Sequence, residues 1–253
     1  MSSSNDLSSR ACVVTGGTRG IGLAIAEQLL ERGARVVIAS RKAPAVEAAR
    51  ERLSRFGESL VATTCNVGEA DQRAALVATC VEAFGALDCL VNNAAANPVF
   101  GEVEDTEPWA FAKIMQVNVE APFELAKLAL PHLKDSDHGA VLNVSSIGGL
   151  SPEPKLGIYS VSKAALNSLT KVLAKEWGRY GIRVNAICPG LIQTDFSQAL
   201  WQDERLLAHM RAATPLGRIG QPEEIAKLAA GILGEVGSYC TGHIFTADGG
   251  YTL

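Results

Sequence analysis

The chain has 253 residues, 47% of them hydrophobic and 20% charged, which is the balance of an ordinary globular protein. Its net charge is −4 and it contains no basic block, which argues against nucleic acid as a partner. No apolar run approaches the roughly 18 residues that a bilayer-spanning helix needs, and the N-terminal stretch MSSSNDLSSR lacks the apolar segment of a secretory signal.

Short apolar runs alternate with helix-length segments along the chain. The runs predict strands at 11–15, 34–39, 60–65, 87–91, 140–144, 182–187 and 243–247, and the segments between them predict helices at 21–32, 44–55, 69–84, 107–133, 157–178 and 222–234. Nearly continuous β-branched runs are typical of strands buried on both faces of a parallel sheet. Repeated strand-then-helix units imply right-handed crossovers. We therefore predict one Rossmann-like α/β domain over 1–253, with a doubly wound parallel sheet of about seven strands in a three-layer α/β/α arrangement.

Two stretches depart from this alternation. Residues 1–9 are predicted to be a frayed tail. Residues 189–221 contain no strand pattern and only patchy helix, and a connection this long in a compact domain is usually a lid or a binding loop. We expect part of this segment to close over a substrate. A small helical subdomain that packs on the body, or a set of oligomer contacts, is the alternative.

A glycine-rich stretch, TGGTRGIG at 15–22, directly follows the first predicted strand and opens the first helix. Glycine lets the backbone approach a pyrophosphate closely, and the N–H groups of a helix N-terminus attract its charge. In this strand–turn–helix context the stretch predicts a dinucleotide site, whereas a tight turn without a ligand is the alternative. The expected contacts are Gly16, Thr18, Arg19, Gly20, Ile21 and Gly22.

The end of the second predicted strand favours NADP(H) over NAD(H). A carboxylate at this point would bind the ribose 2′-hydroxyl of NAD, but Ser40 stands there and is followed by Arg41 and Lys42. An arginine can bind a 2′-phosphate through paired charge-assisted hydrogen bonds. Arg19, inside the glycine stretch, could face the same phosphate.

The cysteines and histidines give no sign of a metal site. Six cysteines and four histidines are scattered without zinc spacing, so we predict no catalytic metal. Several cysteines lie in apolar strand-like runs and none forms a CxxC pair. This pattern favours buried, reduced thiols in a cytoplasmic protein.

The stretch YSVSK places Tyr159 and Lys163 four residues apart at the start of a predicted helix, and therefore on one face of it. Ser146 comes thirteen residues earlier, at the carboxyl end of a predicted strand, where ligands bind in such sheets. A serine hydroxyl can hold a carbonyl oxygen while a phenol delivers a proton to it, and a nearby cation would lower the pKa of the phenol. Ser145 competes for this role, but adjacent residues point in opposite directions, so only one should face the site.

Taken together, these motifs resemble the short-chain dehydrogenase/reductase family in its compact single-domain form, from about Arg10 to the C-terminus. The resemblance also rests on NNAA at 92–95, Asn118 in QVNVE, PGLIQT at 189–194 and TADGG at 246–250, all in the expected order. It implies the catalytic set Asn118, Ser146, Tyr159 and Lys163, and its spacing favours Ser146 over Ser145. It also implies that Lys163 hydrogen-bonds the nicotinamide ribose and that Asn118 holds a water that continues the proton path.

The resemblance implies further contacts along the cofactor. Near the adenosine ribose it places Asn92, Asn93 and the backbone around Ala94, and beside the adenine Asn66 and Val67. Beside the nicotinamide half it places Ile21, Pro189, Gly190, Ile192 and Thr194, the last near the carboxamide. The chain departs from the family in two places, with NNAAAN where NNAG is frequent and with Asn66 where an aspartate is usual.

The segment NPVFG at 97–101 resembles the NADP-dependent carbonyl reductases of the tropinone-reductase type. Pro98, Val99 and Phe100 are therefore expected at the mouth of the substrate site, with plain loop packing as the alternative. Phe196 and Trp201 of the long 189–221 segment are the other expected substrate contacts.

We therefore expect an NADP(H)-dependent carbonyl (ketone) reductase that uses Tyr159 as its acid or base, acts on a small molecule and forms a homotetramer or homodimer. A 3-oxoacyl-carrier-protein reductase is one alternative, but such an enzyme should present a basic patch to its acidic carrier. The arginines at 205, 211 and 218 are diluted by Asp195, Asp203 and Glu204. A catalytically silent NADPH-binding protein is a second alternative, but it should lack part of the catalytic set.

Overall fold

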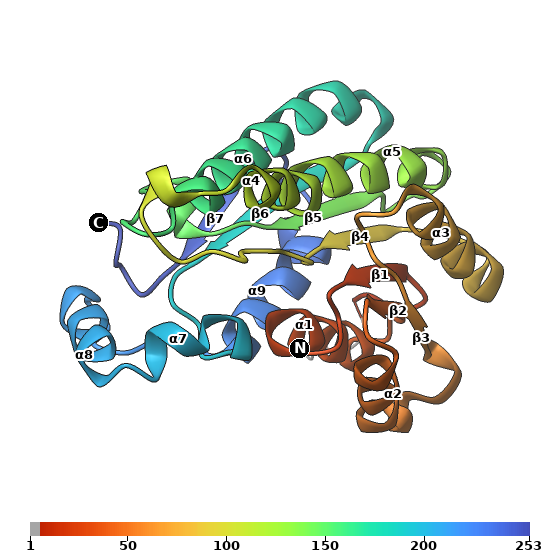
Figure 1. Cartoon of the computed structure of the whole chain (residues 1–253). Helices are drawn as coiled ribbons and strands as arrows, with labels where there is room; N and C mark the ends of the chain where they lie inside the picture. The colour runs from red at the N-terminus through yellow and green to blue at the C-terminus, as the bar shows by residue number, and fades with distance from the viewer. Residues whose placement is uncertain (1–5) are drawn as a thin grey trace.

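The computed structural model describes residues 6–253, and within them a single parallel sheet has the strand order β3-β2-β1-β4-β5-β6-β7 (Figure 1). The strands are β1 (Ala11–Thr15), β2 (Arg35–Ser40), β3 (Leu60–Thr64), β4 (Cys89–Asn92), β5 (Ala140–Val144), β6 (Arg183–Pro189) and β7 (Ile244–Ala247). Each strand lies within a few residues of its predicted position. The predicted doubly wound sheet of seven strands is therefore confirmed.

Helices cover both faces of the sheet. They are α1 (Gly20–Glu31), α2 (Ala43–Arg52), α3 (Ala70–Phe84), α4 (Pro108–Met115), α5 (Ala121–Lys134), α6 (Gly157–Trp177), α7 (Gln198–Trp201), α8 (Glu204–Ala213) and α9 (Pro222–Leu233). One core cluster joins α1, α2 and α9 to the sheet, and the other joins α3, α5 and α6 to the opposite face, which gives three layers (Figure 1). No helix within residues 6–253 combines the length and apolar character required to cross a membrane.

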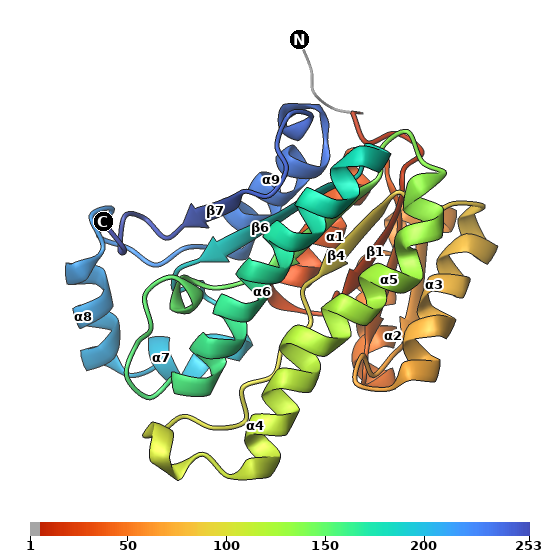
Figure 2. The same ribbon diagram turned by 90° about the horizontal axis from the view of Figure 1, so that it is seen from above.

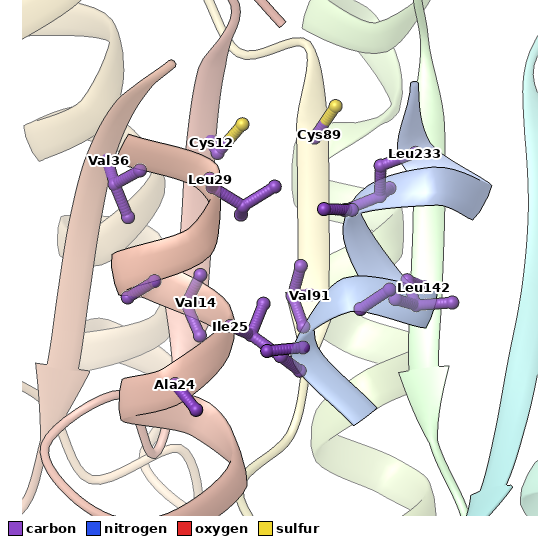
Figure 3. Packing of buried hydrophobic residues seen from close by; sticks show 14 of the residues in the cluster. Cys12, Val14, Ala24, Ile25, Leu29, Val36, Cys89, Val91, Leu142 and Leu233 are labelled. Atoms are coloured by element: carbon purple, nitrogen blue, oxygen red, sulfur yellow. The ribbon is translucent and has the colours of Figure 1, made fainter. Parts of the chain in front are cut away.

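Successive strand residues supply alternate faces of the core, as the two-residue period of a strand requires. In β1, Cys12 and Val14 join the α1/α9 cluster, while Ala11 and Val13 join the cluster on the other face. Figure 3 shows the first cluster from close by, with strand side chains packed against Ile25 and other residues of α1 and α9. Because both faces are covered, the strands read in the sequence as unbroken apolar runs.

The order of the strands creates the place for a site. The chain runs outward from β1 to β2 and β3, then returns to add β4 on the other side of β1. In such sheets a crevice opens beyond the carboxyl ends of the strands where the order reverses. Figure 2 shows α7 and α8 beyond the carboxyl ends of β6 and β7, at the same edge of the sheet.

The helix predicted over 107–133 is interrupted. A π-turn, Gln116–Glu120, separates α4 from α5, and the N–H of Ala121 donates to the carbonyl of Gln116. Pro122 lacks an N–H, so it cannot donate to the carbonyl four residues earlier as an α-helix would require. A local π-turn is a common response to such a defect and is frequent at functional sites.

The prediction of a frayed tail over residues 1–9 is wrong for residues 6–9, whereas residues 1–5 lie outside the described residues. Leu7 is fully buried and belongs to the α1/α9 cluster. Asp6 accepts a hydrogen bond of 2.7 Å from Arg32 Nε, with both side chains largely shielded from solvent. Burial of one leucine and a shielded ion pair therefore hold a segment whose polar composition indicated a tail.

Candidate active site

A cleft lies at the carboxyl ends of β1, β2 and β4 and encloses about 1070 Å³ of empty space, its open mouth included. The cleft brings together most of the residues predicted to contact cofactor or substrate. These are Gly16, Thr18, Arg19, Gly20, Ile21, Gly22, Ser40, Arg41, Asn66, Val67, Asn93, Ala94, Tyr159, Lys163, Thr194 and Phe196.

Other predicted residues lie off the cleft wall, among the described residues. They are Lys42, Asn92, Pro98, Val99, Phe100, Asn118, Ser146, Pro189, Gly190, Ile192 and Trp201. The wall also contains Ser145, the alternative to Ser146, and residues that the sequence did not point to, namely Cys65, Ala95, Ala96, Val117, Val144 and Asp195. Each missed residue lies within a few positions of a predicted one, so the strand ends and loops were recognised but not every residue in them.

The glycine stretch forms a cradle that side chains would fill. Gly16 has a φ of +64°, and a Cβ there would lie 2.8 Å from Asn93 Nδ2. A Cβ at Gly22 would overlap the same amide and the Gly16 carbonyl. Asn93 Nδ2 donates to the carbonyls of Thr15 at 2.8 Å and Gly16 at 3.1 Å, which ties the cradle to the end of β4. Backbone left bare at a helix N-terminus suits a pyrophosphate, so the residues present fit a dinucleotide.

We expect Gly22→Ala to destabilise the protein by about 1–3 kcal/mol, because the added methyl must displace the Asn93 amide or the Gly16 carbonyl. Thermal unfolding with and without dinucleotide would show a lower Tm and a smaller gain on adding ligand. Gly178→Ala is the matched control, since a Cβ there meets nothing within 4 Å and the backbone is helical. Equal behaviour of the two variants would contradict the tight cradle.

The cations expected to bind a 2′-phosphate occupy different surroundings. Ser40 and Arg41 both line the cleft at the end of β2, and Arg41 forms no ion pair with another residue of the 6–253 range. Arg19 lies 3.8 Å from Asp195 across the cleft mouth, with both side chains more than 60% exposed. Exposed pairs of this kind contribute little stability. Lys42 precedes α2 as its N-cap and stays outside the cleft.

Tyr159 and Lys163 lie one turn apart in α6 at the inner end of the cleft. Lys163 is 1% exposed, its Nζ donates to the Val144 carbonyl at 2.8 Å, and it lies 5.6 Å from the centre of the Tyr159 ring. Burial lowers the pKa of the Lys163 ammonium to about 8. The Lys163 ammonium therefore loses its proton as the pH rises through about 8.

The pKa of the Tyr159 phenol is raised, whereas the neighbouring Lys163 was expected to lower it. Burial raises the pKa of Tyr159 to about 12, and a hydrogen bond with the Ser146 hydroxyl acts in the opposite sense. That expectation is wrong for the protein by itself, because desolvation of the phenolate outweighs its neighbours. The phenol consequently keeps its proton at neutral pH, as a proton donor must.

The two neighbouring serines have different hydrogen-bond partners, and of the two only Ser145 lines the cleft. Ser145 is buried and its hydroxyl donates to the Lys163 carbonyl at 3.2 Å, so it anchors α6 to β5. The Ser146 Oγ accepts the N–H of Gly148 at 3.1 Å and reaches the phenol of Tyr159. Ser146 is therefore the hydroxyl that can share a carbonyl oxygen with Tyr159.

Asn118 does not reach the cleft with its side chain. It is fully buried in the π-turn, where its Oδ1 accepts the Ala96 N–H at 2.8 Å and its Nδ2 donates to the Ala96 carbonyl and to Ser162 Oγ, both at 3.0 Å. Both N–H groups of the amide are thus used. The side chain therefore holds the cleft wall at Ala96, while the Asn118 carbonyl lacks the usual helical donor because residue 122 is proline, so the predicted role in holding a water stays a prediction.

The predicted place of Asn92, near the adenosine ribose, is wrong. It is 3% exposed within β4, where its Nδ2 donates to Asn143 Oδ1 at 2.9 Å. Asn143 in turn donates to Thr170 Oγ1 at 2.9 Å. The side chain therefore belongs to a buried ladder that joins β4, β5 and α6, and does not approach a ribose. Strand side chains alternate between the two faces of the sheet, so residues two positions from Asn92 point to the same face.

The 189–221 segment contributes its first part to the cleft. Phe196 lies 6.2 Å from Tyr159 between ring centres and is half exposed. Trp201 lies off the cleft wall, because its indole N–H donates to the Thr194 carbonyl at 2.8 Å and so holds Thr194 in place. In agreement with the prediction, the segment beyond Pro189, the last residue of β6, has no named strand and contains only short helical pieces and α8.

Three further predicted contacts are displaced by pairing within the fold. Pro189 is the last residue of β6 and pairs with Ala247 of β7, and the N–H of Gly190 donates to the Ala247 carbonyl at 3.0 Å. Ile192 is buried and forms an isolated bridge with Gly220. Phe100 is 52% exposed and does not line the cleft. Within residues 6–253, no cluster of three or more histidines, cysteines or carboxylates is arranged to hold a metal ion.

Comparisons with known proteins agree with this geometry. The family profile described as enoyl-(acyl carrier protein) reductase matches residues 16–252. Dehydrogenase/reductase SDR family member 4 from Sus scrofa is 43% identical over 96% of this chain and 88% of its own length, and the Homo sapiens protein of that name is 41% identical over 99% and 90%. Dehydrogenase/reductase SDR family member 2, mitochondrial, from Homo sapiens is 40% identical over 96% and 86%.

A solved structure gives the same result. The crystal structure of a short-chain alcohol dehydrogenase from Sinorhizobium meliloti 1021 superposes with a TM-score of 0.91 and 33% sequence identity, covering 96% of each chain. The sequence matches span nearly the whole chain and the structural match reproduces its fold. The chain therefore belongs to the short-chain dehydrogenase/reductase family of oxidoreductases, which use a nicotinamide cofactor.

Proposed function

We propose that the protein is an NADP(H)-dependent carbonyl reductase that converts a ketone or aldehyde to an alcohol and catalyses the reverse oxidation. The observation that carries the proposal is the position of the Tyr159 phenol, which lines the cleft beside Lys163 and the glycine cradle and forms a hydrogen bond with the Ser146 hydroxyl. This set can stabilise and protonate an oxygen anion as it forms. A protein that only bound the dinucleotide would not need it.

The roles of the residues follow from their protonation states. When bound, the nicotinamide supplies the hydride that the carbonyl carbon accepts. Ser146 donates a hydrogen bond to the carbonyl oxygen, and Tyr159, whose pKa is raised to about 12, holds the proton that this oxygen takes. The buried ammonium of Lys163 stabilises the phenolate that remains. In the reverse direction the phenolate accepts the proton of the alcohol.

The choice of NADP(H) rests on Arg41. Arg41→Asp should lower kcat/KM for NADPH by about 10- to 100-fold, because hydrogen bonds to a charged group contribute about 1.5–3 kcal/mol. The ratio of kcat/KM for NADH to that for NADPH should therefore rise. Steady-state kinetics with both cofactors measures the ratio. Lys42→Asp makes the same charge change one residue away but outside the cleft, so it should move the ratio much less. An unchanged ratio in Arg41→Asp would remove the support for NADP(H).

The substrate class is proposed from the apolar surface beside the phenol. Phe196 offers an exposed ring at the cleft, which favours a moderately hydrophobic carbonyl compound. A 3-oxoacyl-carrier-protein reductase would need a basic surface for its carrier, but Arg218 is paired with Glu224 at 2.7 Å. A panel of small ketones, aldehydes and acyl-carrier thioesters, followed at the nicotinamide absorbance band, separates the two activities.

We also propose a homo-oligomer and a cytoplasmic location. Among the described residues, α5 and α6 expose the apolar side chains Phe123, Leu128, Val161 and Val172, which a partner copy could cover. The cysteines at 12, 65, 80, 89, 188 and 240 are all free thiols, which suits a reducing compartment. Light scattering in solution would give the number of copies.

A further inference from the structure

The π-turn Gln116–Glu120 contacts the two opposite walls of the cleft. Asn118 holds the backbone of Ala96 on one wall through both its amide oxygen and its amide nitrogen. Gln116 Nε2 donates to the Gly68 carbonyl at 3.1 Å, directly after the wall formed by Cys65, Asn66 and Val67. Two side chains of one short turn therefore link the segments between which the cofactor would lie.

The amide of Gln116 has a single possible orientation. Lys113 Nζ lies 3.1 Å from Gln116 Oε1, and an ammonium group can only donate hydrogen bonds. The amide oxygen must therefore face Lys113, which leaves Nε2 to face the Gly68 carbonyl. Orientation of a glutamine amide is normally inferred from such neighbours, and here the neighbour is decisive.

Two other hydrogen bonds also shape the segment held by Gln116, which contains Cys65, Asn66, Val67 and Gly68. Asn66 Oδ1 accepts the Gly68 N–H at 3.2 Å, which closes a tight turn over these residues. Arg73, which is 4% exposed, donates to the Val67 carbonyl at 2.7 Å. These bonds set the internal shape of the segment. Gln116 is the hydrogen-bond donor that reaches it from the π-turn and so sets its place relative to the opposite wall.

We propose that Gln116 is a positioning residue for the adenine end of the cofactor, acting through the carbonyl of Gly68. The inference rests on the proposed function, in which Asn66 and Val67 border the adenine. Without the N–H of Gln116 the segment loses its direct hydrogen bond to the π-turn. It keeps the contact of Arg73 with Glu120 and the packing of Val67 with Val117, while Tyr159 and Lys163, on α6, keep their places. Loss of one hydrogen bond of this kind corresponds to about 1 kcal/mol, or roughly fivefold in affinity.

The test uses Gln116→Glu, which keeps the shape of the side chain and its contact with Lys113 but removes the donor. Calorimetry would give the Kd for NADPH and for adenosine 2′,5′-bisphosphate, a fragment that carries only the adenine end. Both Kd values should rise by the same factor, about fivefold, while kcat at saturating NADPH stays unchanged. Gln28→Glu makes the same chemical change near the far end of α1, away from the cleft, and should leave both Kd values as they are.

The inference is overturned if both Kd values match those of the wild type, or if kcat falls while the fragment binds normally. Should Gln116→Glu fail to fold, Gln116→Met removes the same donor without adding a charge, and the same measurements apply. A wild-type protein that binds neither ligand would overturn the proposed function together with this inference. A wild type that binds both, beside a variant that binds equally well, would overturn this inference alone.

Discussion

Replacing Tyr159 by phenylalanine should reduce carbonyl reduction by about 100- to 10,000-fold, the range that a positioned general acid supplies. The ring and its contact with Phe196 persist, so the cleft keeps its shape and only the transferable proton is lost. The loss should appear in kcat, measured with a ketone substrate at saturating NADPH.

Binding of NADPH separates this role from a structural one. The variant should bind NADPH with a Kd close to that of the wild type in a fluorescence titration, because the phosphates and adenine contact other parts of the cleft. Lost binding together with lost turnover would mean that Tyr159 holds the cofactor and does not act on the substrate. Retained turnover would exclude the phenol as the acid.

Replacing Lys163 by methionine should be nearly as damaging, since it removes the cation that stabilises the phenolate. We expect kcat to fall by at least about 100-fold. In the wild type, reduction should decline as the pH rises through about 8, where the Lys163 ammonium loses its proton. The residual activity of the variant should lack this decline, and a pH profile of kcat from pH 6.5 to 9.5 measures both. An identical decline in both proteins would assign it to another group.

The lowered pKa of Lys163 also predicts how the stability of the protein changes with pH. The pKa of Lys163 is lowered from 10.5 to about 8 in the folded protein, so between these values the unfolded chain binds a proton that the folded protein does not. The free energy of unfolding of the wild type should therefore rise with pH across this window, relative to Lys163→Met, by up to about 3 kcal/mol. Urea unfolding at pH 8 and at pH 10 would measure the difference. A relative fall would contradict the burial of the charge.

Asn118 is conspicuous in the sequence, but its side chain does not line the cleft. The family resemblance implies that Asn118, in the QVNVE stretch, holds a water of the proton path. In the folded protein it is fully buried and both of its N–H groups are used by Ala96 and Ser162. A motif match identifies a position but not the partners of its side chain, and here those partners, Ala96 and Ser162, lie far from Asn118 in the chain.

Local chemistry made most of the fold and the reactive group predictable. Apolar β-branched runs mark strands covered on both faces, and the glycine stretch after the first of them marks the cradle. The spacing of Tyr159 and Lys163 places both on one side of α6 without knowledge of the rest of the structure. These features depend on residues close together in the chain, so they can be read from the sequence alone.

The remaining features depend on contacts between segments far apart in the chain. Burial by the surrounding layers raises the pKa of Tyr159 to about 12 and lowers that of Lys163 to about 8. The packing of Leu7 against the core orders residues that look like a tail, and a hydrogen bond to the Ala247 carbonyl ties the backbone of Gly190 to the end of β7. The sequence by itself determined which groups are available for catalysis. Only the tertiary structure decided which of them face the cleft and in what protonation state, because desolvation and hydrogen-bond partners are supplied by distant parts of the chain.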